Sequence, residues 1–393
     1  MAVKIVRQSN KIAVLGAPTS AAAMSAGSEG APAALRAAGL ILSLRSVGYE
    51  VADLGDDPIQ TFQPDTESPR ARNIPAVLKS IESLKPRVEQ AVKSGALPLI
   101  FSGDCSIALA TVAGARRYFR NISMIYMDAD ADLNTPATTP SGCLDGMVVS
   151  HLTGRGAPEL VRFWSEPFLV REPDLALFGV SRLDPPEEKL LSTSPLRRYL
   201  LADVKRHGAA ASAKTALERI RGNGNDFVLH LDLDVISDFA ATNYPSANGL
   251  SFDEVREALL IFAQQKNLAA IEVTAYNPAK DSDGSAAKKI IDLLAEVLGH
   301  RLEVLKAAES AAAAAAPPKP APAAATSIPE TKPVDHAEEV PGVGLPEPVS
   351  GEGWSSDSLD TGVETEDETQ TEPDHSKHSL EGPEDEESSR SNS

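Results

Sequence analysis

Two stretches of this sequence place acidic side chains directly after apolar runs. In the first, Asp128, Asp130 and Asp132 follow the run Ile122–Met127 at alternate positions. Alternate side chains of an extended chain share one face, so we expect these three carboxylates to lie close together. Buried anions in such a group repel one another unless a cation lies among them. A divalent metal ion is the usual solution.

The second stretch repeats this pattern later in the chain. The apolar run Phe227–Leu233 contains His230 and Asp232, and Asp234 follows with the same period of two. The carboxyl ends of neighbouring parallel strands meet at one edge of a sheet, where α/β proteins bind their ligands. Two such stretches favour a metal site over a solvated acidic loop. Two interpretations of His230 stay open: a ligand of this site, or a core histidine bonded to a neighbouring side chain.

The elements that position these residues alternate along the chain. Apolar runs predict strands at Lys11–Gly16, Tyr49–Leu54, Leu97–Phe101, Ile122–Met127, Asp174–Val180, Phe227–Leu233 and Leu268–Thr274. Helices are predicted at Ala31–Val47, Ile74–Ser94, from Ser106 to about Tyr118, at Pro185–Leu191, in part of Pro195–Val204, and at Ala213–Arg221, Ser251–Gln265 and Ser285–Ala308. This alternation predicts the α/β class, with a single three-layer α/β/α domain around a mostly parallel sheet.

The composition of the chain changes at Glu309. Residues 309–393 begin with alanine and proline and continue as an acidic tract, with 20 Asp and Glu against 4 Lys and Arg. The whole chain of 393 residues carries a net charge of −19, so most of this charge belongs to the last segment. Such a segment buries too little apolar surface to offset its ordering entropy. We therefore predict a folded domain over residues 1–308 and a disordered acidic tail over 309–393.

Several classes of protein are disfavoured by composition. The two cysteines, Cys105 and Cys143, form no disulfide framework and fit a reducing compartment. No apolar run is long enough to span a membrane and no export signal opens the chain, so we predict a cytoplasmic protein without a membrane partner. Residues 1–308 have no basic excess, which argues against nucleic acid. The expected partner is a small-molecule substrate.

Several motifs, in order along the chain, resemble the arginase/agmatinase/formiminoglutamase superfamily, the ureohydrolases. They are Gly16-Ala17-Pro18, Ser102-Gly103-Asp104-Cys105-Ser106, Asp128-Ala129-Asp130-Ala131-Asp132-Leu133-Asn134, Ser141-Gly142-Cys143-Leu144-Asp145-Gly146 and Asp232-Leu233-Asp234. The resemblance covers Ile12 to Ala308. It implies an arginase-like domain and a homo-oligomer, either a trimer or a hexamer.

The resemblance also implies a metal cofactor. In the superfamily, two Mn²⁺ ions held by two histidines and four aspartates activate a hydroxide that attacks a guanidinium carbon. The metal ligands carried over to this chain are Cys105, Asp128, Asp130, Asp132, Asp232 and Asp234, with His230 as a further candidate. Both histidine positions are changed, to Cys105 and Asp130, which marks a divergent branch. The many carboxylates favour a hard cation such as Mn²⁺, whereas the thiolate favours Zn²⁺ or Fe²⁺, and one ion instead of two is an alternative.

The same resemblance assigns further roles. Asp130 and Asp145 are the expected catalytic residues; Asp145 stands where the superfamily has a proton-shuttling histidine, and as an ionised carboxylate it acts as a base rather than an acid. Asn134 and Ser141 are the expected substrate-binding residues. Ala275 stands where the superfamily has a guanidinium-binding glutamate, so a charge-assisted contact is lost.

Three functions compete on these grounds. The first is a metal-dependent hydrolase that acts on a C–N bond in a guanidino, amidino or related linear nitrogen compound. The second is a catalytically inactive ureohydrolase-like scaffold that binds a ligand or a protein partner, which the lost histidines and Ala275 favour. The third, a nucleotide-binding oxidoreductase, is disfavoured because Gly16-Ala17-Pro18 places proline where a phosphate-binding turn needs glycine.

Overall fold

A parallel sheet forms the centre of the domain. Within the described residues, eight strands lie in the order β2-β1-β3-β8-β7-β4-β5-β6, and every pairing is parallel. Their bounds are β1 (Lys11–Ala17), β2 (Glu50–Asp56), β3 (Leu97–Ser102), β4 (Ile122–Met127), β5 (Leu175–Phe178), β6 (Arg197–Tyr199), β7 (Asp226–Asp232) and β8 (Leu268–Thr274). Because β4 and β7 are neighbours, the acidic stretches that follow them lie at the same edge of the sheet.

The computed structural model describes residues 5–119, 121–220, 225–315 and 342. The chain divides into a compact unit, Met1–Lys319, and a second unit, Pro320–Ser393. The predicted disorder of the tail concerns residues that, apart from Glu309–Ala315 and Gly342, lie outside the described part. In that part, no helix combines the length and the apolar character needed to cross a membrane.

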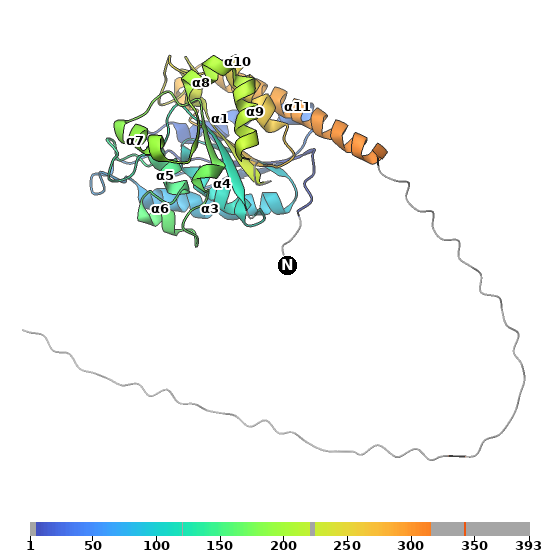
Figure 1. Ribbon diagram of the computed structural model, residues 1–393, viewed down its shortest axis with the longest axis horizontal. Helices are drawn as coiled ribbons and strands as arrows, with labels where there is room; N and C mark the ends of the chain where they lie inside the picture. Colours follow the sequence, from blue (N-terminus) through green and yellow to red (C-terminus); the bar gives the residue numbers. More distant parts are fainter. Residues whose placement is uncertain (1–4, 120, 221–224, 316–341, 343–393) are drawn as a thin grey trace, which may run out of the picture. The chain divides into compact units, whose positions relative to one another are not determined.

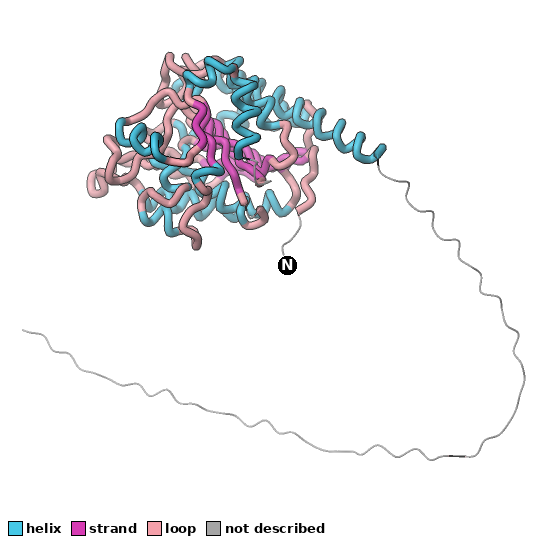
Figure 2. Tube along the Cα trace, viewed as in Figure 1, coloured by secondary structure: helices cyan, strands magenta, loops and turns pink. Residues whose placement is uncertain are grey.

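Helices cover both faces of the sheet and enclose two hydrophobic cores (Figures 1 and 2). On one face, the core contains residues of α1 (Ala31–Ala37), α2 (Leu40–Ser46), α8 (Leu201–His207), α9 (Ala209–Ile220), α10 (Phe252–Ala263) and α11 (Ser285–Ala315). On the other face, it contains residues of α3 (Ile74–Lys93), α4 (Ala108–Arg116), α5 (Val148–Leu152), α6 (Pro158–Arg162) and α7 (Pro185–Thr193). The predicted three-layer α/β/α architecture is confirmed.

Three of the differences from the sequence-based expectation have a clear physical reason. The helix predicted over Ala31–Val47 is two helices, because Gly39 has a φ of 98° and breaks the hydrogen-bonding pattern between them. The segment Pro195–Val204 contains the edge strand β6 before its helix begins, and a strand this short has no recognisable period. Helix α11 continues past Ala308 to Ala315, because alanine, which fills most of this segment, has the highest helix propensity of all residues.

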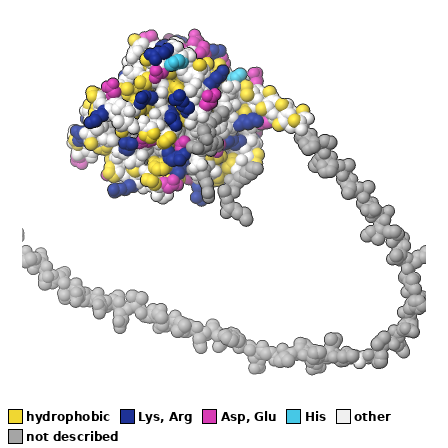
Figure 3. Space-filling model, viewed as in Figure 1, with side chains coloured by type: hydrophobic (Ala, Val, Ile, Leu, Met, Phe, Trp, Pro, Cys, Tyr) yellow, Lys and Arg dark blue, Asp and Glu magenta, His cyan; other side chains and the backbone are white. Residues whose placement is uncertain are grey.

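The face of the described part shown in Figure 3 has mixed charge. On this face, Lys and Arg side chains are interspersed with Asp and Glu side chains. Oppositely charged pairs such as Arg256 with Glu296 and Lys288 with Asp292 join helix residues that are exposed to solvent. Exposed pairs of this kind contribute little to stability, about 0–1 kcal/mol each, so the fold depends on the two cores.

His151 is a titratable side chain buried within one of the helical layers. It lies in α5 and is only 2% exposed, and its Nε2 has no hydrogen-bond partner in the described part of the chain. Its ring packs against Gly156, where an added Cβ would lie 1.9 Å from the ring. Burial lowers the pKa of His151 from 6.5 to about 3. The unfolded chain therefore binds a proton below about pH 6.5 that the folded chain does not bind.

We expect this difference to make the fold sensitive to acid. The stabilisation from neutral His151 is complete above about pH 6.5 and is lost as the pH falls towards 3, by up to ~1.4 kcal/mol per pH unit. In the H151L variant, the free energy of unfolding, measured with urea at several pH values, should fall less steeply in this range. The exposed His300 offers a matched control, because H300L should keep the steep dependence. Parallel curves for the parent and H151L would contradict this prediction.

Candidate metal centre

The centre lies where β3, β4 and β7 end. Cys105 begins a short 3-10 turn, Cys105–Ile107, directly after β3, and Asp104 precedes it as the N-cap. The buried carboxylate of Asp104 accepts hydrogen bonds from the Ser106 amide at 3.1 Å, the Thr19 hydroxyl at 3.0 Å and the Ala22 amide at 3.1 Å. The bond from Ser106 satisfies a free amide at the start of the turn, and the bonds from Thr19 and Ala22 hold the Asp104 carboxylate in place beside Cys105.

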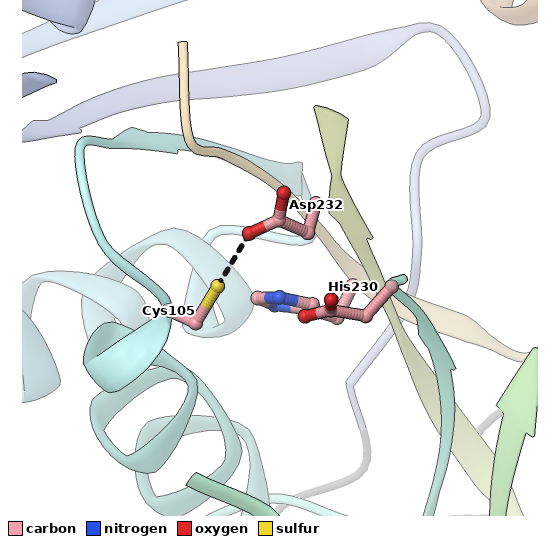
Figure 4. A group of neighbouring side chains, drawn as sticks. Cys105, His230 and Asp232 are labelled. Carbon is pink, nitrogen blue, oxygen red and sulfur yellow. Dashed lines mark hydrogen bonds between the residues drawn. The ribbon is translucent and has the colours of Figure 1, made fainter. Parts of the chain in front are cut away.

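Four buried residues form a first donor group, which we call the sulfur-containing group: Cys105, Asp128, His230 and Asp232. One potential ligand atom from each lies within 4.8 Å of the others. The Cys105 Sγ is 2.8 Å from Asp232 Oδ2 and 3.2 Å from Thr274 Oγ1. Figure 4 shows Cys105 and Asp232 pointing toward one another, with the ring of His230 beside them. A thiol, an imidazole and two carboxylates therefore converge on one point.

The ring of His230 is held from two sides. Its Nδ1 lies 2.8 Å from Glu272 Oε2, and its face stacks on Tyr126 at a centroid distance of 4.2 Å. Its Nε2 is on the side of Thr274, 3.4 Å from Oγ1. Both interpretations of His230 thus find support, since it is a core histidine with a neighbour and also a member of the sulfur-containing group. A carboxylate that orients the second nitrogen is typical of metal-bound histidines.

A second donor group, which we call the carboxylate group, consists of Asp128, Asp130 and Asp234, and their oxygens also lie within 4.8 Å of one another. Arg182 is bound in it. Its Nε is 2.9 Å from Asp130 Oδ1, and its Nη2 donates to Asp130 Oδ2 at 2.7 Å and to Asp234 Oδ2. The two donor groups share Asp128 but differ in their chemistry.

Asp132 departs from the sequence-based expectation that it shares a face with Asp128 and Asp130. The chain leaves the extended conformation after Met127, where Asp128 Oδ1 accepts a hydrogen bond from the Asp130 amide at 2.7 Å. Asp132 itself has a φ of 51°, and its Oδ2 accepts a hydrogen bond from the Tyr126 hydroxyl at 2.5 Å. Asp132 lines a cavity beside the two donor groups but belongs to neither group.

The electrostatics of the centre call for a cation. Burial, reinforced by the neighbouring aspartates, raises the pKa of Asp128, Asp132 and Asp232 well above the usual range. Burial and the same negative charges raise the pKa of the Cys105 thiol. Burial alone lowers the pKa of Arg182, but hydrogen bonds and charge from Asp130 and Asp234 outweigh it and raise that pKa overall. Carboxylates placed this close together stay ionised when a cation lies among them.

A cavity of about 450 Å³ opens beside the two donor groups. Asn134, Ser141 and Asp145, the other expected site residues, all line it. Asp145 Oδ1 accepts a hydrogen bond from the Cys105 amide at 2.7 Å, and burial, with the nearby Asp104, raises the pKa of Asp145 to about 8. The structure thus brings all the sequence-predicted site residues to one cavity except His230, which is fully buried and does not line it but belongs to the sulfur-containing group.

Four titratable lining residues were missed by reasoning from the sequence: Arg182, Asp184, Glu187 and Tyr244. Three of them follow β5, which lies next to β4, so the rule that sites form at strand ends could have found them. Glu187 Oε1 accepts the Leu133 amide at 2.8 Å, and Asp184 Oδ2 accepts the Asn134 side chain at 2.8 Å. These bonds connect the segment after β5 to the one after β4.

The position expected to bind a guanidinium is altered. Ala275 has a φ of 65°, is buried, and does not line the cavity. Glu272 lies on the sheet face that carries His230, and one of its oxygens bonds to that ring while Oε1 has no partner in the described residues. Glu272 therefore supports the imidazole and leaves the role at position 275 unfilled.

Comparison with known proteins identifies the family. The Arginase family profile matches residues 10–299. An arginase of Bacillus caldovelox is 30% identical over 295 residues, covering 74% of this chain and 99% of that protein. The native structure of arginase from Bacillus caldovelox superposes with a TM-score of 0.68 at 29% identity, over 74% of this chain and 98% of that one. The formimidoylglutamase of Bacillus subtilis, at 20% identity and a TM-score of 0.59, over 77% of this chain and 89% of that one, shares the fold.

This chain belongs to the arginase family. Membership supports, at the level of the family, a metal-dependent hydrolase that acts on amidino or guanidino groups. The donor atoms fit a divalent metal ion, because a thiol, an imidazole and two carboxylates are a common ligand set for such ions. The fit holds for the sulfur-containing group; in the carboxylate group, Arg182 already bonds to oxygens of Asp130 and Asp234.

Proposed function

We propose that this protein hydrolyses a carbon–nitrogen bond in a small linear compound of the guanidino or amidino type, with the help of a bound divalent metal. The observation that carries this proposal is the convergence of the sulfur-containing group on an acidic cavity. A divalent ion held there supplies a Lewis acid that lowers the pKa of a bound water molecule towards neutrality. The superfamily resemblance favours Mn²⁺, whereas the Cys105 thiolate favours Zn²⁺.

The walls of the cavity select for a nitrogen-rich substrate. Asp132, Asp145, Asp184 and Glu187 contribute carboxylates to the lining, and Arg182 is the one Lys or Arg among the described lining residues. A cleft lined by one sign of charge concentrates ligands of the opposite sign. Because Ala275 offers no carboxylate, we assign recognition of the substrate's cationic group to Asp184, which the Asn134 amide orients.

Asp145 is the residue we assign as the general base. Both oxygens of Asp130 are bonded to Arg182, so Asp130 is poorly placed to accept a proton. Asp145 is held by the Cys105 amide on Oδ1, while its Oδ2 is 3.5 Å from the Tyr244 hydroxyl, a weak contact that leaves Oδ2 open to the cavity. Burial raises the pKa of Asp145 to about 8, so it acts as a base in its ionised form, which a bound cation favours.

A second candidate function is a scaffold that binds a ligand without turning it over. The observation that favours it is the occupation of the carboxylate group by Arg182. Such a protein would bind nitrogen-rich ligands in the cavity and release no product from them.

The test is a turnover assay on full-length protein purified without chelators and incubated with Mn²⁺ or Zn²⁺. A panel of guanidino, amidino and formimino compounds would be offered, and urea, ammonia and formamide would be measured. Metal-dependent release of product from at least one compound is expected. Binding of panel members without any product, by protein that contains metal, would overturn the hydrolase and support the scaffold.

A further inference from the structure

We propose that this centre binds a single divalent ion, in the sulfur-containing group, and that the Arg182 guanidinium supplies positive charge in place of a second ion. This inference rests on the metal-binding part of the proposed function and narrows it. It departs from the two Mn²⁺ ions that the superfamily resemblance implies. The difference lies in residues of this chain, and it can be measured without any substrate.

The Arg182 guanidinium lies within the carboxylate group. It forms a two-pronged contact with Asp130, at 2.9 Å and 2.7 Å, and reaches Asp234 with the same Nη2. Asp130 and Asp234 supply two of the three carboxylates of the carboxylate group. Both Asp130 oxygens thus already accept charge-assisted hydrogen bonds from a planar donor that suits carboxylates well, so neither is free for a second ion.

Further hydrogen bonds hold Arg182 beside the carboxylate group. The amides of Ser181 and Arg182 both donate to the Ala129 carbonyl at 2.9 Å, which ties the segment after β5 to the acidic segment after β4. The Nη1 of Arg182 donates to the Tyr244 carbonyl at 3.0 Å, so the guanidinium is bonded on three sides. A second ion would have to displace these bonds and would meet the repulsion of the guanidinium.

The sulfur-containing group keeps ligand atoms that Arg182 does not contact. Among the hydrogen bonds of the described residues, none joins Arg182 to Cys105, His230 or Asp232. Glu272 orients the imidazole of His230 through a hydrogen bond to Nδ1. Metal-bound histidines typically have such a partner on their second nitrogen. Sulfur, nitrogen and two carboxylates match the four-ligand preference of Zn²⁺ better than the oxygen-rich, six-coordinate preference of Mn²⁺.

The experiment is a metal titration of the full chain, followed by elemental analysis, with Zn²⁺ and with Mn²⁺. We expect the parent protein to retain one ion per chain, with Zn²⁺ bound more tightly. The R182A variant frees the carboxylate group and should bind a second, weaker ion. The control is R256A, which removes an arginine from the exposed pair with Glu296 and should keep one ion.

The number of ions bound separates a failure of this inference from a failure of the proposed function. Two ions in the parent protein, or one ion in a folded R182A variant, would overturn the inference while leaving a metal-dependent hydrolase intact. No ion in the parent would instead overturn the metal-binding part of the proposed function. If R182A does not fold, Co²⁺ added to the parent protein decides: one ion with a thiolate-to-metal absorption band supports the inference, and saturation without that band contradicts it.

Discussion

Replacing Asp232 by asparagine should remove both the bound metal and the activity. Asp232 Oδ2 contacts the Cys105 sulfur at 2.8 Å, and Oδ1 accepts the Asp234 amide at 2.7 Å, so this one side chain faces the metal site and also holds the turn after β7. Asparagine keeps an acceptor for that amide but loses the negative charge. A Lewis acid contributes several kcal/mol to the transition state, so turnover should fall at least about a thousandfold.

The measurement combines elemental analysis with the turnover assay. Asp238, in the loop that follows the same strand, provides a matched control, because it is exposed and has a φ of 59° that asparagine also tolerates. D238N should keep metal and turnover at the level of the parent protein. If D232N binds metal as tightly as the parent and retains turnover, the assignment of the sulfur-containing group is wrong.

The parts of the site that the sequence predicts are those tied to a local pattern. The runs before Asp128 and Asp232 are mostly apolar, which is typical of strands buried on both faces, and β4 and β7 have nearly the predicted bounds. Their carboxylates meet because parallel neighbours end at the same edge. The conformation of Asp132 could not be predicted in this way, since a single positive φ in a loop leaves no periodic trace.

Contacts that depend on strand order were out of reach of sequence reasoning. Glu272 and His230 are opposite each other because β7 pairs with β8, and no local signal announces this pairing. Arg182 was missed for the same reason. It is a single charged residue after β5, and its role becomes clear only when the adjacent segments bring Asp130 and Asp234 next to it.

Replacing Cys105 by serine should change which metal the centre prefers. Serine is close to cysteine in size and can keep the hydrogen bond to Asp232, so the turn that begins at Cys105 should fold as before. It removes the one soft ligand of the sulfur-containing group and leaves an imidazole and carboxylates. The affinity for Zn²⁺ should fall by at least about a hundredfold, because even an altered supporting residue around a metal weakens binding about 10–100-fold.

The affinity for Mn²⁺ should change far less, because a hard ion gains little from sulfur, and the preference between the two metals narrows or inverts. Competition between Zn²⁺ and Mn²⁺ for the C105S variant, measured against a chromophoric chelator, tests this directly. Cys143 allows the same chemical change in the same cavity wall, but it belongs to neither donor group. C143S should therefore keep the metal preference of the parent, and an unchanged Zn²⁺ affinity in C105S would mean that the thiol is a packing residue. In that case the divergence at Cys105 would leave binding to the imidazole and carboxylates, whose harder donors favour the Mn²⁺ that the superfamily resemblance implies.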